Sequence, residues 1–306
     1  MDRPAFTRKD PNGTDGPTPD EAQVPPEWET LSLDLSGSLM VVGGPDTGKS
    51  TFSSFLYRRL HAAAPTTALL DADPGQGRLG PPATTALHRP GGGGDRLFFM
   101  GSSSPSGHML PLLAGVAAMI REAYESGAKT LVCDTTGLID PAAGGLRLKR
   151  AKIALLRPSH LFAFQHGDEL EPLLQPLRAG GRVRVVDLRP PEAVRPRTRE
   201  ERRARRAERF ARYFRRAGSL QVDGSALPVF PAPRFDPNRL LALEDAEGFA
   251  LGLGIVQAAS EDGRSLQLLT PVPALEGVNA LTLGDLTVEP HTFFDTHAPL
   301  RQVGIR

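Results

Sequence analysis

A short segment at residues 43–51, GGPDTGKST, has the residue types and spacing of a phosphate-binding loop. It fits the pattern Gly-x-x-x-x-Gly-Lys-Ser, in which backbone N–H groups and the start of the next helix surround a phosphate. In this pattern Lys49 reaches the β- and γ-phosphate oxygens, and the Ser50 hydroxyl ligates Mg²⁺. The predicted nucleotide-binding residues are Gly43, Gly44, Pro45, Asp46, Thr47, Gly48, Lys49, Ser50 and Thr51.

Acidic residues end two of the predicted strands. Asp71 and Asp73 follow an apolar run in LLDADPGQG, and Asp134 follows another in LVCDTTG. Because the carboxyl edge of a parallel sheet faces the ligand crevice, we expect these acids near the phosphate loop. Asp134 is predicted to bind Mg²⁺ together with Ser50. One of Asp71 and Asp73 could hold metal-bound water and the other could accept a proton from an attacking hydroxyl, and a turn rich in Asp, Pro and Gly is the alternative.

Residues 195–216 form a strongly basic segment, and the rest of the chain is mildly acidic. The segment holds eleven Arg against three Glu, whereas the whole chain has a net charge of +1. Read as a helix, it places Phe210 and Phe214 on one stripe and Arg202 and Arg206 on another. Guanidinium groups neutralise the charge on a transferring phosphoryl group, and they also hold nucleic-acid phosphates. A solvated basic helix is the alternative.

The elements that must position these residues alternate between strands and helices. Strands are predicted for the apolar runs at 39–42, 66–73, 96–101, 129–137, 160–165 and 182–188, and helices for most of the segments between them. The stretch 74–95 is predicted to be a loop because it is rich in Gly and Pro. This alternation predicts an α/β fold, in which helices cover both faces of a parallel sheet, like that of P-loop NTPases.

The domain organisation follows from changes in composition along the chain. Residues 1–25 are polar and rich in Pro and Gly, which predicts a disordered tail. Residues 26–217 form the predicted α/β domain, with the Arg-rich segment at its end. Residues 218–306 alternate short Val-, Leu- and Thr-rich runs with turns, which predicts a small β-rich C-terminal domain.

Composition also restricts where the protein works. Cys133 is the single cysteine, which excludes an internal disulfide framework and a cysteine-rich metal site. No apolar run approaches the roughly 20 residues that cross a bilayer, and the N-terminus has no apolar signal region. We therefore expect a cytoplasmic protein without a membrane partner, and the sequence indicates no particular protein partner.

Taken in order, GGPDTGKST, DADPGQG, DTTG and the Arg-rich segment resemble the polynucleotide 5′-hydroxyl kinases. That family includes the RNA kinase of the eukaryotic mRNA 3′-end cleavage and tRNA-splicing machinery, the pre-ribosomal-RNA processing kinases and shorter prokaryotic relatives. The resemblance covers residues 39–216, and the C-terminal runs EGFALGLGIV and LTLGDL look similar to the shorter relatives. It implies an RNA-processing transferase that moves the γ-phosphoryl group of ATP, or of another nucleoside triphosphate, to a 5′-hydroxyl end of RNA or DNA.

The resemblance also implies roles for individual residues. Lys49 and Ser50 would serve the nucleotide and Mg²⁺, and Asp71 or Asp73 would act as the base. Arg202 and Arg206 match the arginine pair of a lid that closes over the transferring phosphate. The acceptor strand would be held by Gln76, by Ser103 and Ser104 of a clasp in GSSSP, and by Thr136 and Gly137 of a T-x-G element.

One position departs from the eukaryotic pattern, and other functions remain open. Leu138 stands where the eukaryotic members have a Trp that stacks on a base, so the preference for RNA or DNA is not indicated. A GTPase-like switch is an alternative suggested by DTTG, although none of the three Asn residues begins an N-K-x-D element. An RNA-binding protein with a regulatory nucleotide site and a small-metabolite kinase are further alternatives.

Overall fold

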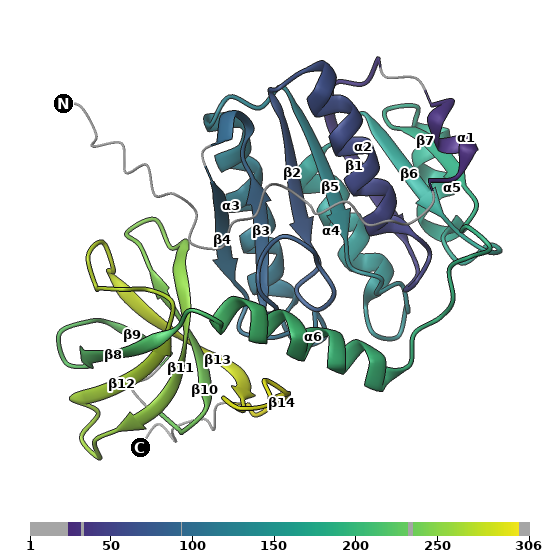
Figure 1. Cartoon of the computed structure of the whole chain (residues 1–306). Coiled ribbons are helices and arrows are strands. Elements are labelled where there is room, and N and C mark those ends of the chain that lie inside the picture. Colours follow the sequence, from purple (N-terminus) through teal and green to yellow (C-terminus); the bar gives the residue numbers. More distant parts are fainter. Residues whose placement is uncertain (1–23, 32–33, 93, 232–234, 300–306) are drawn as a thin grey trace. The chain divides into compact units, whose positions relative to one another are not determined.

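The computed structural model describes residues 24–31, 34–92, 94–231 and 235–299 (Figure 1). Of the predicted disordered tail, residues 1–23 lie outside the described part. The chain divides into two compact units. Unit 1 draws on Met1–Ala72, Ala86–Arg96 and Val116–Arg195, and unit 2 on Asp73–Thr85, Leu97–Gly115 and Pro196–Arg306. The expected boundary after residue 217 stays a prediction.

Unit 1 contains a mainly parallel sheet. Its strand order is β3-β2-β5-β1-β6-β7, in which the last five strands run parallel and β3 runs antiparallel to β2. The strands are β1 (Gly37–Gly43), β2 (Thr67–Ala72), β3 (Thr84–His88), β5 (Thr130–Thr135), β6 (His160–Phe164) and β7 (Arg184–Leu188). The strands β1, β2 and β5 are almost entirely buried, because helices cover both faces of the sheet. This confirms the predicted α/β class.

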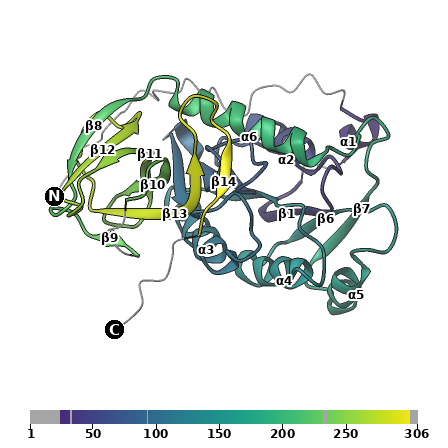
Figure 2. The same ribbon diagram turned by 90° about the horizontal axis from the view of Figure 1, so that it is seen from below.

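Helices occupy opposite faces of this sheet. Figure 2 shows α1 and α2 on one face and α4 and α5 on the other. Their bounds are α1 (Pro26–Glu29), α2 (Lys49–Ala63), α4 (Gly145–Leu156) and α5 (Glu171–Gly180). The short η1 (Pro90–Gly92) lies in unit 1, whereas β4 (Asp95–Phe99) and α3 (Met109–Glu125) cross the division between the units. No helix in the described ranges is both long and apolar enough to span a membrane.

The strand β3 corrects one expectation from the sequence. The stretch 74–95 is rich in Gly and Pro and was expected to be a loop throughout, yet Thr84–His88 pairs with β2 through Leu70 and Leu87. The run TTALH has the β-branched residues of a strand, but its flanking Gly and Pro residues conceal it. The antiparallel pairing also makes the sheet mixed at this edge.

Unit 2 is built around antiparallel strands and the Arg-rich helix α6 (Arg199–Phe214). Its strands are β8 (Gly218–Asp223), β9 (Val229–Phe230), β10 (Arg239–Glu244), β11 (Ala250–Ala259), β12 (Ser265–Thr270), β13 (Ala280–Val288) and β14 (Asp295–His297). The order β14-β13-β10-β11-β12-β8 is antiparallel, and β9 lies parallel to β13. The region beyond residue 218 is β-rich, as expected.

The helix α6 is positioned by its cap and by two phenylalanines. The Thr198 hydroxyl accepts the Glu201 N–H at 3.1 Å, and the Glu201 carboxylate accepts the Thr198 N–H at 2.8 Å. This capping box stabilises the helix start by about 1 kcal/mol. Phe210 and Phe214 are buried in one apolar cluster with residues of β10, β11 and β13. The helix therefore belongs with the strands of unit 2.

Trp28 anchors the first helix of unit 1 and gives a stability test. Its ring is 1% exposed, and its centroid lies 5.1, 5.9 and 6.0 Å from those of Phe52, Phe55 and Phe164. We expect Trp28→Ala to lower the free energy of unfolding by about 3–5 kcal/mol. Urea unfolding followed by circular dichroism measures this, with the smaller loss expected for Trp28→Phe as the control. Equal stability of all three proteins would contradict it.

Candidate functional site

The predicted phosphate loop joins β1 to α2. Asp46 and Gly48 have φ angles of +50° and +90°, a backbone that turns successive N–H groups toward one point. A side chain at Gly43 would place its Cβ 2.7 Å from the Phe164 carbonyl oxygen, so only glycine fits there. The nine predicted nucleotide-binding residues thus lie in one loop and the first turn of α2. Their roles with a nucleotide stay predictions.

Lys49 is buried inside this loop. Its ammonium donates to the Gly44 carbonyl oxygen and lies 3.3 Å from Thr47 Oγ1, and the residue is 6% exposed. The Thr47 hydroxyl in turn donates to the Gly44 carbonyl oxygen at 3.0 Å. The loop therefore holds a cation among its own oxygens, where arriving phosphate oxygens are stronger acceptors for it.

Asp134 lies against the first turns of α2. Its Oδ1 accepts the Ser53 hydroxyl at 3.2 Å and the Thr135 N–H at 3.0 Å. Ser50 and Ser53 are three residues apart on this helix and so share a face. Hydroxyl and carboxylate oxygens are ligands that Mg²⁺ prefers, and Mg²⁺ beside a nucleotide needs only one or two protein carboxylates. The residues present therefore fit a Mg²⁺ ion, although the described residues contain no cluster of three metal-ligating side chains.

Asp71 lies beside Asp134 at the ends of two neighbouring parallel strands. The two residues are partners in the β2–β5 register, so their side chains leave the same face of the sheet. Both are buried, at 5% and 4% exposure. The predicted acids of these two strands are thus adjacent within unit 1.

Asp73 shapes the loop that follows β2. Its Oδ1 accepts the N–H groups of Gly75 and Gln76, each at 3.0 Å, which is an Asx turn. A Cβ at Gly75 would lie 2.5 Å from the Ser103 carbonyl oxygen, so this loop packs closely on the GSSSP segment. Asp73 therefore shapes the loop that contacts the GSSSP segment.

Thr136 and Gly137 lie beside the phosphate loop. A Cβ at Gly137 would be 2.7 Å from Pro45 Cα, which leaves no room for a side chain. The Thr136 hydroxyl accepts the Leu138 N–H at 3.4 Å. Gly137 is therefore packed against Pro45 of the phosphate loop, and the acceptor-binding role of both residues stays a prediction.

The remaining predicted residues meet within unit 2. The Gln76 amide donates to the Arg202 carbonyl oxygen at 3.3 Å, which joins the DADPGQG loop to α6. Ser103 and Arg206 both contact Asp295, a residue that no sequence motif indicates. Ser104 is exposed, and its hydroxyl accepts the Ser106 N–H at 3.2 Å. The predicted lid and clasp residues are therefore neighbours in one unit.

Two fully buried lysines of α4 are also missed by the motifs. Lys149 donates to Thr135 Oγ1 at 2.8 Å and to the Thr136 carbonyl oxygen, and Lys152 donates to the Ala72 carbonyl oxygen at 3.0 Å. They bind the ends of β5 and β2, directly beside the predicted acids. Helical periodicity could have found them, because both lysines fall on the buried stripe of this helix.

The same region surrounds Cys133. Burial raises the pKa of its thiol to about 12, and four charged groups act on it: Lys152, Asp134, Lys149 and Asp71. Two acids and two lysines thus lie around one buried strand end, which keeps the local charge balanced. A balanced cluster explains how four buried ionisable groups can be accommodated.

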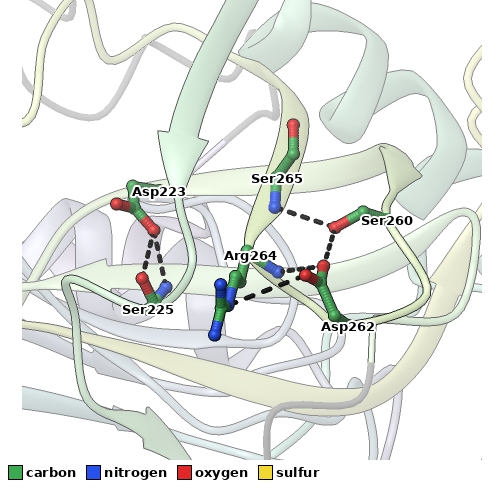
Figure 3. Close-up of a pocket in the computed structure, with 6 residues that line it drawn as sticks. All are labelled: Asp223, Ser225, Ser260, Asp262, Arg264 and Ser265. Atoms are coloured by element: carbon green, nitrogen blue, oxygen red, sulfur yellow. Dashed lines mark hydrogen bonds and ion pairs between the residues drawn. The ribbon is translucent and has the colours of Figure 1, made fainter.

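Figure 3 shows a pocket in unit 2. Asp223 accepts the Ser225 hydroxyl at 2.6 Å, and Asp262 accepts the Ser260 hydroxyl at 2.5 Å. The lining consists of Asp223, Ser225, Ser260, Asp262, Arg264 and Ser265. These contacts are local turn bonds between residues close in sequence, and the predicted site residues are not among the lining.

The parallel sheet, the glycine loop, the buried lysine and the strand-end acids define a P-loop nucleotide-binding protein. A family model described as the P-loop of the mRNA cleavage and polyadenylation factor CLP1 matches residues 43–216, more than half of the chain. The protein belongs to this family, which confirms the resemblance found in the sequence.

Archaeal proteins are similar over most of the chain. A polyribonucleotide 5′-hydroxyl-kinase of Thermococcus kodakarensis is 28% identical, and the match covers 82% of this chain and 88% of that protein. One of Methanocaldococcus jannaschii is 25% identical over 82% of this chain and 87% of that protein. The solved structure of a wild-type Clp1p–Pcf11p complex aligns with a TM-score of 0.64 at 13% identity, covering 82% of this chain and 74% of that one. That structure shows the common fold.

Proposed function

We propose that the protein is an ATP- and Mg²⁺-dependent polynucleotide 5′-hydroxyl kinase that acts on RNA, with DNA ends as a second acceptor. The family supports this assignment, and so does the activity for which the archaeal relatives are named. A cytoplasmic location, expected from composition, belongs to the same proposal. The observation that carries it is Lys49, whose buried ammonium is already held inside the phosphate loop.

The proposed chemistry is in-line transfer of the γ-phosphoryl group. A bond forms between the 5′-oxygen of the acceptor and the γ-phosphorus, and the bond between that phosphorus and the bridging oxygen of ADP breaks. Lys49 binds the phosphate oxygens, and the guanidinium groups of Arg202 and Arg206 neutralise charge on the transferring group. Ser50 and Asp134 would hold a Mg²⁺ ion, which would screen the charge of the phosphates. The proton of the acceptor hydroxyl passes to an aspartate.

A labelled-ATP assay with matched oligonucleotides tests this function. RNA and DNA strands that end in a 5′-hydroxyl, single-stranded and duplex, should gain label, whereas the same strands with a 5′-phosphate should not. We expect RNA to be labelled faster than DNA. If the purified protein labelled none of the 5′-hydroxyl strands while still binding ATP, the kinase assignment would be wrong.

A GTPase-like switch is the second candidate, because DTTG lies beside the phosphate loop. A switch of this class binds GTP far more tightly than ATP, and it hydrolyses nucleotide without passing phosphate to a strand. Competition between ATP and GTP therefore separates the two functions. Preference for ATP would support the kinase, and strict preference for GTP would favour the switch.

Asp71, near the end of β2, and Asp73, just after it, are expected to have different roles. Asp71 is the register partner of Asp134, so we assign it to metal-bound water, and we assign the base to Asp73. Asp73→Asn keeps an oxygen that can accept the Gly75 and Gln76 N–H groups, so the loop survives while the base is lost. We expect this variant to lose about 10²–10⁴-fold in kcat at unchanged Mg²⁺ requirement.

Asp71→Asn should instead raise the Mg²⁺ concentration that gives half-maximal rate. Mg²⁺ titration of both variants measures the difference. The reverse pattern, with the Mg²⁺ requirement moved by Asp73→Asn alone, would exchange the two assignments.

A further inference from the structure

The proposed lid arginine is held by a carboxylate from the C-terminal strand β14. Arg206 Nε lies 2.9 Å from Asp295 Oδ2, and Arg206 Nη2 lies 3.0 Å from Oδ1. The two residues form a bidentate salt bridge. The side chain of Asp295 is 3% exposed and that of Arg206 is 19% exposed. Such pairs fix the plane of the guanidinium as well as its distance.

The same carboxylate holds the clasp. The Ser103 hydroxyl donates to Asp295 Oδ2 at 2.9 Å, although the two residues are 192 positions apart in the chain. One carboxylate therefore contacts both the lid helix and the GSSSP segment. Removing its charge should loosen two segments that the sequence assigns to different tasks.

The position of Asp295 is itself fixed by the sheet and by α6. Asp295 is the register partner of Val288 in β13. Two neighbouring residues also contact α6. The Arg203 guanidinium lies 4.8 Å from the centre of the Phe294 ring. The Phe293 ring stacks on that of Phe214, with 6.0 Å between the ring centres. Residues 293–295 thus follow one face of α6 over several turns.

The pair leaves Arg206 able to bind phosphate. Asp295 uses Nε and Nη2 of Arg206, and Nη1 donates a long hydrogen bond of 3.5 Å to the Arg202 carbonyl oxygen. Nη1 and Nη2 each carry two N–H groups, so this edge can donate to a phosphoryl oxygen while the pair with Asp295 stays intact. When a carboxylate already fixes one edge of an arginine, the side chain loses less conformational entropy when its other edge binds a ligand. The contact is therefore suited to orienting the guanidinium of Arg206 toward a phosphoryl group.

We propose that Asp295 is a positioning residue that aims the lid arginine Arg206 and holds the clasp residue Ser103 in register with it. This inference rests on the proposed kinase function, and it gives the C-terminal strands a task in that reaction. Asp295 acts through its two partners and touches neither the nucleotide nor the acceptor.

A double-mutant cycle tests the contact with Arg206. Asp295→Asn should lower kcat about 10–100-fold with the KM for ATP changed less than about threefold. In the Arg206→Ala background the same change should cost clearly less, because the arginine that Asp295 orients is gone and only its contact with Ser103 is left to lose. Asp262→Asn, which alters an exposed acid paired with Arg264, is the matched control and should keep the wild-type rate. Equal losses in both backgrounds would overturn the proposal.

Hydrogen exchange gives a readout that does not need activity. In Asp295→Asn, peptides covering 101–108 and 199–209 should both exchange faster than in the wild type and in Asp262→Asn. Ser103→Ala removes only the hydrogen bond from residue 103 to Asp295, so exchange should become faster in 101–108 alone. Unchanged exchange in both segments would overturn the inference. A wild-type protein that labels no 5′-hydroxyl strand would instead refute the proposed function, and exchange would still decide whether Asp295 holds both segments.

Discussion

Replacing Lys49 with alanine should lower phosphoryl transfer by about three orders of magnitude or more. Lys49 is the buried cation of the phosphate loop, held by the Gly44 carbonyl oxygen and Thr47 Oγ1. In a site with little water, a charge aimed at the transferring group contributes more than it would in solvent. The rate is measured with labelled ATP and a saturating single-stranded RNA that ends in a 5′-hydroxyl.

Controls separate lost chemistry from lost structure. Lys129→Ala removes an exposed lysine of unit 1 and should transfer phosphate at the wild-type rate. Thermal unfolding of Lys49→Ala should remain cooperative, because the loop carbonyl can bind water once the ammonium is gone. Nucleotide binding can be followed by the emission of Trp28, the only tryptophan, which lies near Gly48. Wild-type transfer by Lys49→Ala would refute the role assigned to the loop.

The phosphate loop was predictable because its information is local. The two glycines, the lysine and the serine lie within a few residues, and the geometry needs only a strand before them and a helix after them. The α6 helix was predictable for the same reason, since its phenylalanines repeat at helical spacing and Thr198 and Glu201 form a capping box. In both cases each residue acts on neighbours in the same element.

The contacts that sequence reasoning missed join distant parts of the chain. Asp295 lies 89 positions from Arg206, so nothing in either local pattern marks the other residue. Lys149 and Lys152 belong to no motif, and charged side chains are usually solvated, so only their position on the buried stripe of α4 could have marked them. The strand β3 was missed because its pairing with β2 overrides the Gly and Pro residues around it.

Arg206→Ala is expected to lower kcat by about 10³-fold or more, the range seen when an arginine that stabilises a transferring phosphoryl group is removed. Arg206→Lys should not restore the rate, because one ammonium cannot form a bidentate pair with Asp295 and also present a planar edge to phosphate. Arg212→Ala, which removes an exposed arginine of the same helix, is the matched control and should stay close to the wild-type rate.

The two variants also separate binding from chemistry. Both lose one positive charge, so both should weaken RNA binding slightly and to a similar extent at low salt. Only Arg206→Ala should lose transfer at saturating RNA, since its guanidinium is held in a defined orientation by a buried carboxylate. If Arg206→Ala and Arg212→Ala had equal kcat values and differed in RNA affinity alone, α6 would act as a binding surface and the catalytic role of its arginine would have to be abandoned.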